Sequence, residues 1–344
     1  MLSVLNVAFP FAPVGPDTVG GAEQVLGQID RALVEAGHRS FVIALEGSCV
    51  AGTLIPVPVP EGPLDGETRR RAHVRHREAI MGAVARHRID VVHLHGIDFF
   101  AYLPPPGVPV LVTLHLPLSW YSPEALTPKR PDTWLHGVSA SQQRGMAESA
   151  HLLPPVENGV AVEDLAGFHH AKRRFALALG RICPEKGYHL ALEAAHAAAA
   201  PLLIGGQVYP YEAHRRYFDE AVAPKLDRLR RFLGPLGFVR KRRLAAAARC
   251  LLVPSLAPET SSLVAMEALA CGTPVVAFPN GALADIVEHG RTGFLVHDVR
   301  EMADAIGEAG GIDPAQCREA AFARFSLRQS MERYLDLYER LAGA

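Results

Sequence analysis

The sequence predicts an α/β protein made of two Rossmann-like domains, each a parallel β-sheet covered by helices, with a cleft between them. Short segments rich in β-branched residues alternate with longer helical segments along the chain. This alternation pauses once, in a segment rich in Pro, Gly and polar residues at 151–174, and then begins again. Strand–helix alternation is typical of parallel sheets, because parallel strands are joined by crossover helices. Two such series of similar length therefore predict two facing domains.

The first series defines an expected N-terminal domain, residues 1–155. Its strands are expected at Val4–Phe9, Ser40–Leu45, Asp90–His95, Val108–His115 and Trp134–Ser139, and its longer helices at Ala22–Ala36 and Glu67–His87.

The second series defines an expected C-terminal domain, residues 156–325. Its strands are expected within 175–180, 201–206, 230–234, 250–255, 273–278 and 293–296, and its helices from Gly187, over Glu212–Leu229, over Lys241–Arg249 and within 254–277. In the last segment, 326–344, large side chains recur at intervals of three and four residues, which predicts an amphipathic helix. They are Met331, Tyr334, Leu335 and Tyr338.

The composition excludes several classes of function. The 344 residues include 35 Lys and Arg and 36 Asp and Glu, so no bulk charge attracts nucleic acid. Aromatic residues make up 7% of the chain, which also argues against a base-stacking surface. The five cysteines stand singly, a pattern that predicts reduced, buried thiols in a cytoplasmic protein. No apolar run approaches the ~18 residues of a membrane span, so we expect a soluble protein.

The residues that follow each strand are the first candidates for a site, because ligands of open parallel sheets bind beyond the carboxyl ends of the strands. Gly20 and Gly21 follow the first strand and precede a helix, where glycines let a ligand approach the backbone and free N–H groups favour an anion. Arg181 and Lys186 follow the first strand of the second series, beside the next helix. Two cations there predict a diphosphate site, although two solvated cations on a loop would give the same pattern.

Two carboxylates mark the segment 254–277. Glu267 lies within an almost wholly apolar helix, and Glu259 lies in the loop before it. An unpaired buried carboxylate costs several kcal/mol, so Glu267 should reach water, a ligand or a basic partner. The two acids could contact separate parts of one elongated ligand, with Thr260, Ser261 and Ser262 available to cap the helix. The alternative is a structural ion pair between Glu267 and an arginine of a neighbouring strand.

These motifs resemble those of the retaining glycosyltransferases of family 4. The resemblance runs nearly end to end and includes "GGAEQVLGQIDRALVEAGH", "DVVHLH", "ENGV", "LGRICPEKG", "FLGPLGFV", "PSLAPETSSLVAMEALACGTPVVA" and "NGALADIVEHGRTGFLV". It implies the GT-B fold of two facing Rossmann-like domains, and a final helix, 326–344, that crosses back to the first domain. The compact length is similar to that of antibiotic-tailoring members of the family.

The resemblance implies a role for each candidate residue. Arg181 and Lys186 would hold the diphosphate of a nucleoside-diphosphate sugar, helped by Gly20 and Gly21. Glu259 would bind hydroxyls of the transferred sugar and Glu267 those of the ribose. Val239 would border the nucleobase and His115 would face the donor sugar. Thr260, Ser261, Ser262 and Leu263 complete the implied donor site, where family members commonly have Gly-Phe-Gly after the first acid; this departure leaves the donor sugar open.

The implied reaction is sugar transfer from a donor, by family default a UDP-sugar, to a hydroxyl of an oligosaccharide or natural-product acceptor with retention of configuration. Arg181, Lys186, Glu259 and His115 would carry it, without a metal or another cofactor. Two alternatives stay open. A sugar-nucleotide 2-epimerase shares the fold, and an inactive partner subunit could keep the nucleotide site.

Two further patterns invite other functions. His93 and His95 are two residues apart on an expected strand and face the same side, so they could chelate a metal with His115; cleft lining or core packing is the simpler interpretation. The basic run around Arg69–Arg77 could contact an anionic membrane, but it lacks the bulky apolar face of an interfacial helix, which favours a solvated surface.

Overall fold

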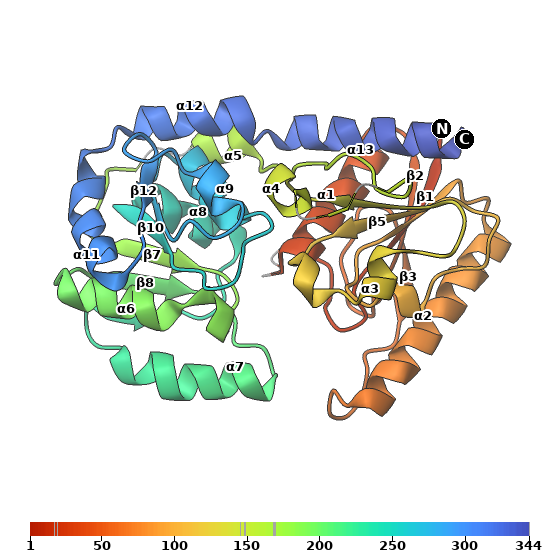
Figure 1. Ribbon diagram of the computed structural model, residues 1–344, viewed down its shortest axis with the longest axis horizontal. Coiled ribbons are helices and arrows are strands. Elements are labelled where there is room, and N and C mark those ends of the chain that lie inside the picture. Colours follow the sequence, from red (N-terminus) through yellow and green to blue (C-terminus); the bar gives the residue numbers. More distant parts are fainter. Residues whose placement is uncertain (17, 19, 145, 148, 168–169, 344) are drawn as a thin grey trace. The chain divides into compact units, whose positions relative to one another are not determined.

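The computed structural model describes residues 1–16, 18, 20–144, 146–147, 149–167 and 170–343. The chain divides into two compact units (Figure 1). Unit 1 comprises Met1–Glu157 and Gln329–Ala344, and unit 2 comprises Asn158–Arg328. Each unit contains one sheet of six parallel strands, which confirms the predicted α/β class with two parallel sheets.

The sheet of unit 1 has the strand order β3-β2-β1-β4-β5-β6. Its strands are β1 (Ser3–Val7), β2 (Arg39–Leu45), β3 (Thr53–Val57), β4 (Val91–Leu94), β5 (Val110–Leu114) and β6 (Thr133–Gly137). The helices of this unit are α1 (Gly21–Glu35), α2 (Gly66–Arg86), the short α3 (Pro123–Leu126) and α4 (Ala140–Gln143), and nearly all of α13 (Leu327–Ala342).

Helices cover both faces of this sheet, because alternate residues of a strand point to opposite faces. Val42 and Ala44 of β2 pack in one cluster with Leu26 of α1. Phe41 and Ile43 of the same strand pack in another cluster that includes Ile80 and Ala83 of α2.

The sheet of unit 2 has the order β12-β11-β10-β7-β8-β9. Its strands are β7 (Ala176–Leu179), β8 (Leu202–Gly205), β9 (Arg230–Phe232), β10 (Cys250–Val253), β11 (Val275–Ala277) and β12 (Gly293–Leu295). Its helices are α5 (Val162–Ala166), α6 (Tyr188–Ala197), α7 (Glu212–Tyr217), α8 (Phe238–Ala247), α9 (Leu263–Ala270), α10 (Leu283–Ile286), α11 (Val299–Glu308) and α12 (Pro314–Arg324).

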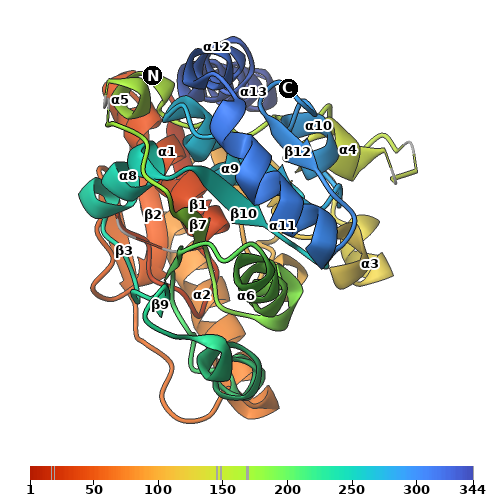
Figure 2. The same ribbon diagram turned by 90° about the vertical axis from the view of Figure 1, so that its left-hand side faces the viewer.

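The main core of unit 2 lies between the strands and the helices α6 and α11, which Figure 2 shows side by side. Ala176 and Ala178 of β7 are buried there against Leu192 of α6 and Ile306 of α11. The small residues on the strands leave room for these helices to pack against the sheet.

The structure differs from the sequence expectations at two segments. The strands expected for the first domain do not include β3; the structure places β3, which contains Pro56, at the sheet edge, where a residue without an N–H is tolerated. The helix expected over Glu212–Leu229 ends early: α7 stops at Tyr217, and π-helical and 3₁₀ turns follow to Lys225. Asp227 then accepts hydrogen bonds from the N–H groups of Leu229 and Arg230, which forms a turn instead of another helical turn.

The cysteines form no disulfide in the described chain. Cys183, Cys250, Cys271 and Cys317 are buried as predicted, and burial raises the pKa of Cys183 to about 11 and that of Cys250 to about 12. Cys49 is exposed, so the prediction of a buried thiol is wrong there, because the residue lies in the loop after β2 and not in a core-facing position.

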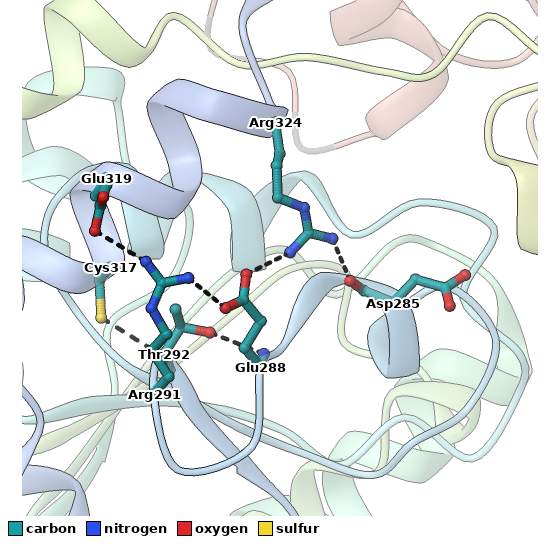
Figure 3. A network of polar contacts seen from close by, with 7 residues as sticks. All are labelled: Asp285, Glu288, Arg291, Thr292, Cys317, Glu319 and Arg324. Carbon is teal, nitrogen blue, oxygen red and sulfur yellow. Dashed lines mark hydrogen bonds and ion pairs between the residues drawn. The ribbon is translucent and has the colours of Figure 1, made fainter.

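An ion-pair network ties the loop before β12 to α12 (Figure 3). The Glu288 carboxylate accepts hydrogen bonds from Arg291 at 2.6 Å and from Arg324 at 3.0 Å. Arg291 also donates to Glu319 at 2.9 Å, and Arg324 donates to the main-chain oxygen of Asp285. One carboxylate therefore holds two arginines that come from different elements.

Candidate functional site

The order of strands in unit 2 marks a switch point between β7 and β10. The chain proceeds from β7 to β8 and β9 on one side, and then returns to place β10, β11 and β12 on the other. The loops that follow β7 and β10 therefore leave the same edge of the sheet in opposite directions. Ligands of open parallel sheets bind at such a point.

The loop after β7 carries Arg181 and Lys186 and is held firmly against β10. Gly187 adopts φ +65°, and a Cβ atom there would lie 2.2 Å from the main-chain oxygen of Pro254. Only glycine allows this approach, so α6 begins next to the end of β10. The N–H of Leu256 also donates to the main-chain oxygen of Glu185 at 2.8 Å, which joins the two loops a second time.

Glu259 is the centre of a compact polar group. Its Oε1 accepts a hydrogen bond from Lys186 Nζ at 2.6 Å and another from the Ser255 hydroxyl. The Glu259 side chain is 10% exposed and that of Lys186 27%. The ammonium group and the hydroxyl both donate to this carboxylate, so its burial is compensated by charge-assisted hydrogen bonds. The structure thus brings the predicted Glu259 and Lys186 together.

The loop after β11 fixes the position of this carboxylate. The Asn280 side chain donates to the main-chain oxygen of Ser255 at 2.6 Å. The main chain of Glu259 bonds Asn280 and Ala282 on either side of Gly281. Three loops, from β7, β10 and β11, therefore converge on Glu259.

Glu267 has a different partner. It lies on α9 and accepts a hydrogen bond from Lys241 Nζ of α8 at 2.8 Å, with its own side chain 6% exposed and that of Lys241 22%. The alternative of a structural ion pair named an arginine from a strand, and the cation that the structure shows beside Glu267 is a lysine on a helix. A basic side chain of the same unit therefore pairs with this buried acid.

The segment between the two acids lies at the start of α9. Ser262 occupies the N-cap position and is buried, but its side chain makes no capping hydrogen bond. The prediction that these hydroxyls cap the helix is therefore wrong for Ser262. Ser261 Oγ is buried and has no hydrogen-bond partner among the described residues. Thr260 is half-buried, and Leu263 begins the helix in the core.

Arg181 is half-buried, and its charge, like that of Glu259, acts on the buried phenol of Tyr188. Burial is the main reason that the pKa of Tyr188 lies far above its usual value. Val239 is 59% exposed in the first turn of α8, on the same helix as Lys241. Arg181 and Glu259 therefore both lie near Tyr188. Val239 lies on the same helix, α8, as Lys241, which donates to Glu267.

In unit 1, the carboxyl end of β1 leads to Gly20 and Gly21. Gly20 is the N-cap residue of α1 and Gly21 its first residue. A Cβ atom on Gly20 would lie 1.8 Å from the carboxylate of Glu23, which is itself buried. The glycine therefore makes room for an acid of this chain in the first turn of α1, where a negative charge is favoured.

His115 follows β5 and forms a hydrogen bond with His95, which follows β4; the Nε2 and Nδ1 atoms are 2.9 Å apart. Burial lowers the pKa of His115 to about 3, and the charge of His136 adds to this effect. His115 is 9% exposed. At neutral pH it can therefore act as a hydrogen-bonding group but not as a cation.

The histidines do not form the metal site that their spacing suggested. His93 uses both ring nitrogens in hydrogen bonds of 2.7 Å, to Tyr338 of α13 and to Thr113 of β5. His95 is paired with His115. Within the described residues, no three ligand atoms that include these imidazoles come close enough to share an ion. Core packing and cleft lining were the simpler interpretation, and the buried network accords with packing.

Three residues of the site were missed by sequence reasoning. Lys241 stands in a run of four basic residues on α8, and nothing in the run distinguishes it from its neighbours. Ser255 lies two residues after the end of β10, so its place near a strand end was the available signal. Asn280 acts through its contact with Ser255 and the loop of Glu259, a contact between segments that only the fold brings together.

The basic helix α2 has the features of a solvated helix. Glu67 forms ion pairs with Arg70 and Arg71 on the exposed face. None of the helices in the described ranges has the length and apolar character needed to cross a bilayer.

Comparisons with known proteins agree with this architecture. A model of glycosyltransferase family 4 matches residues 19–143, and a model of glycosyl transferases group 1 matches residues 173–309. A D-inositol 3-phosphate glycosyltransferase of Saccharomonospora viridis is 38% identical over 141 residues, which are 39% of this chain and 32% of that protein. The chain spans about a third of the length of the curated relatives that it matches.

Solved structures align over nearly the whole chain. AviGT4, a glycosyltransferase involved in avilamycin A biosynthesis, has a TM-score of 0.69 and 25% identity over 100% of this chain and 99% of its own. Alr3699/HepE of Anabaena, in complex with UDP-glucose, has a TM-score of 0.72 and 18% identity over 99% of this chain and 100% of its own. The second likeness concerns the fold alone. With a family model on each unit and these GT-B neighbours, the chain belongs to glycosyltransferase family 4 and has the GT-B fold.

Proposed function

We propose that this protein is a retaining, metal-independent glycosyltransferase that moves a sugar from a UDP-sugar to an acceptor hydroxyl. The observation that supports this most strongly is the Lys186–Glu259 pair at the switch point of unit 2, beside the loop that carries Arg181. The UDP-glucose bound in the Anabaena neighbour supports the choice of nucleotide.

Lys186 can bind the diphosphate while it keeps its hydrogen bond to Glu259. An ammonium group has three N–H donors, and the structure accounts for one of them with the hydrogen bond to Glu259. A second donor can reach a phosphate oxygen, while Arg181 offers a planar fork to the same diphosphate. Their stabilising effect grows as negative charge develops on the leaving group, which is the condition for catalysis.

The two acids accept hydrogen bonds from hydroxyl groups of the donor. Glu259 accepts hydrogen bonds from hydroxyls of the transferred sugar, and Glu267 accepts them from hydroxyls of the ribose. Each is paired with a lysine, and a carboxylate oxygen can accept a further hydrogen bond from a hydroxyl of the donor. In this proposal the remaining donor-binding residues are Gly20, Gly21, Val239, Thr260, Ser261, Ser262 and Leu263, and His115 faces the sugar as a neutral hydrogen-bonding group.

The proposed chemistry breaks the bond between the anomeric carbon and the oxygen of the β-phosphate. The acceptor oxygen bonds the anomeric carbon on the same face, and its proton passes to the departing phosphate oxygen. The products are a glycoside of unchanged anomeric configuration and a nucleoside diphosphate. We also keep a cytoplasmic location as part of this proposal, because the cysteine pattern predicts reduced thiols.

The direct test incubates the purified chain with UDP-sugars and a set of acceptor alcohols, including oligosaccharides, natural products and D-inositol 3-phosphate. We expect UDP release that depends on an acceptor, and a product whose anomeric proton in NMR has the same configuration as the donor. Inversion would overturn the retaining mechanism. Epimerisation of the donor without an acceptor would identify an epimerase, and binding of UDP with neither reaction would identify a partner subunit.

Lys186→Ala tests the role of the diphosphate contact. We expect kcat/KM to fall by a factor that corresponds to a loss of about 2–4 kcal/mol of transition-state stabilisation. The reason is that the ammonium group interacts with negative charge that grows in the transition state. Lys225→Ala is the matched control, since Lys225 forms a surface pair with Glu193 at 3.0 Å in the same unit. Normal turnover by Lys186→Ala would remove Lys186 from the mechanism.

A further inference from the structure

Three side chains near the carboxyl end of β7 present ligand atoms to one another. They are Cys183 and Glu185, from the loop that also carries Arg181 and Lys186, and His214 of α7. One sulfur, one carboxylate oxygen and one ring nitrogen all lie within 4.8 Å of one another. The helix α7 packs against the 3₁₀ turn Pro184–Lys186, so the fold itself brings His214 to this loop. Among the residues that the structure describes, no other group of His, Cys, Asp and Glu meets this criterion.

We propose that Cys183, Glu185 and His214 form a binding site for a thiophilic divalent cation of the Zn²⁺ class. Thiolate, imidazole and carboxylate together are ligands that zinc prefers, whereas Mg²⁺ and Ca²⁺ prefer sites made of oxygen alone. Ligand atoms on one tetrahedral zinc ion lie roughly 3.5 Å apart. Shifts of about 1 Å in the side chains bring the present group to that spacing.

The side chains of His214 and Cys183 have features that suit the binding of such an ion. Nδ1 of His214 is buried and has no hydrogen-bond partner among the described residues. This ring nitrogen is therefore available to a ligand without the loss of a hydrogen bond to the described protein. Cys183 is 2% exposed, and its thiol contacts the Glu185 carboxylate and the main-chain oxygen of Arg181. A bound cation would replace the thiol proton.

This site goes beyond the proposed function, since sugar transfer by this chain uses none of the three side chains. Three protein ligands leave the fourth position of a zinc ion open, as in sites that take water or an anion. The ion would also join α7 to the loop of Arg181 and Lys186, because it bonds residues from both. We therefore expect a bound cation to stiffen that loop and to raise the melting temperature of the protein.

The experiment titrates the metal alone into the full chain, without nucleotide, so that its result is independent of the proposed function. Cys49→Ser serves as the starting protein, because it removes the exposed thiol that could bind metal by itself. With Co²⁺ as a spectroscopic substitute for zinc, we expect one ion per chain and a thiolate-to-cobalt charge-transfer band in the near ultraviolet. Zn²⁺ should displace the Co²⁺ and abolish the band.

Single substitutions added to Cys49→Ser locate the site. Cys183→Ser should abolish the band, and Glu185→Gln and His214→Gln should each weaken zinc binding by ~10–100-fold or more, the loss seen even for outer-sphere partners. His196→Gln is the control, since His196 is an exposed histidine of α6 with its own backbone partner. The absence of a thiolate band in Cys49→Ser, or unchanged zinc affinity in His214→Gln, would overturn the proposal, and neither result would bear on sugar transfer.

Discussion

At the scale of single residues, the two buried acids of unit 2 are the most informative positions. Glu259 and Glu267 are each paired with one lysine, and neither lysine is its neighbour in the sequence. A carboxylate inside an apolar segment signals that some partner exists, because burying it alone is costly. The identity of the partner depends on which loop or helix the fold places beside it.

Lys241→Met tests the pair at this scale. The change removes the cation from a carboxylate that is 6% exposed, so we expect the free energy of unfolding to fall by about 1–3 kcal/mol in urea titrations. Adding Glu267→Gln should recover part of this loss, because the double variant has no buried charge left to compensate. Arg243→Met, an exposed cation on the same helix, should cost little. Equal losses in Lys241→Met and Arg243→Met would contradict the assigned pair.

At the scale of elements, the sequence located most helices and strands, but it did not determine which residues of the last helix, α13, face the core. In α13 the buried face contains Leu337, whereas the predicted Leu335 is only half-buried. Both residues fit a helical period, and packing distinguishes them: the buried face also contains Tyr338, whose hydroxyl forms a hydrogen bond with His93. Periodicity therefore identifies the helix, and a specific contact decides which side faces the core.

Glu288→Gln tests the network that joins the loop before β12 to α12. Hydrogen bonds from Arg291, with a further contribution from Arg324, lower the pKa of Glu288. The network thus stabilises the fold above the unfolded-state pKa of about 4.3, and the effect is lost as the pH falls below that value. We expect the variant to lose roughly 0.5–1 kcal/mol of unfolding free energy at pH 7, since the pairs are partly exposed.

Urea titrations at pH 7 and at pH 4 measure this effect. The difference between the variant and the parent should narrow at the lower pH, because Glu288 of the unfolded parent begins to bind protons there while the folded carboxylate stays ionised. Glu308→Gln, an exposed acid at the end of α11, should differ little from the parent at either pH. A difference for Glu288→Gln that grows toward pH 4 would contradict the assigned role.

At the scale of the whole molecule, the two units differ in how they should respond to acid. Unit 1 buries a group of histidines whose pKa values lie below 6.5, chiefly because of burial. These are His76, His93, His95, His115 and His136. The shifted histidines of unit 2, His189 and His214, are only half-buried.

Unit 1 should therefore lose stability first as the pH falls. The folded histidines stay neutral while those of the unfolded chain bind protons, so stability is complete above about pH 6.5 and declines below it. The decline is at most about 1.4 kcal/mol per pH unit for each group. Hydrogen exchange at pH 7.5 and pH 5, corrected for its intrinsic pH dependence, should show β4 and β5 losing more protection than β7 and β10. Equal or greater loss in unit 2 would contradict this expectation.

The amino-acid sequence by itself determined the α/β class, the two parallel sheets and the positions of the candidate groups at strand ends. Hydrophobic periodicity and the order of strands and helices are local properties, so they can be read along the chain. The tertiary structure alone decided that Lys186 meets Glu259, that Lys241 meets Glu267, and that His214 lies beside Cys183. Such contacts join residues far apart in sequence, and they depend on the order in which strands enter a sheet and on the packing that orients each helix.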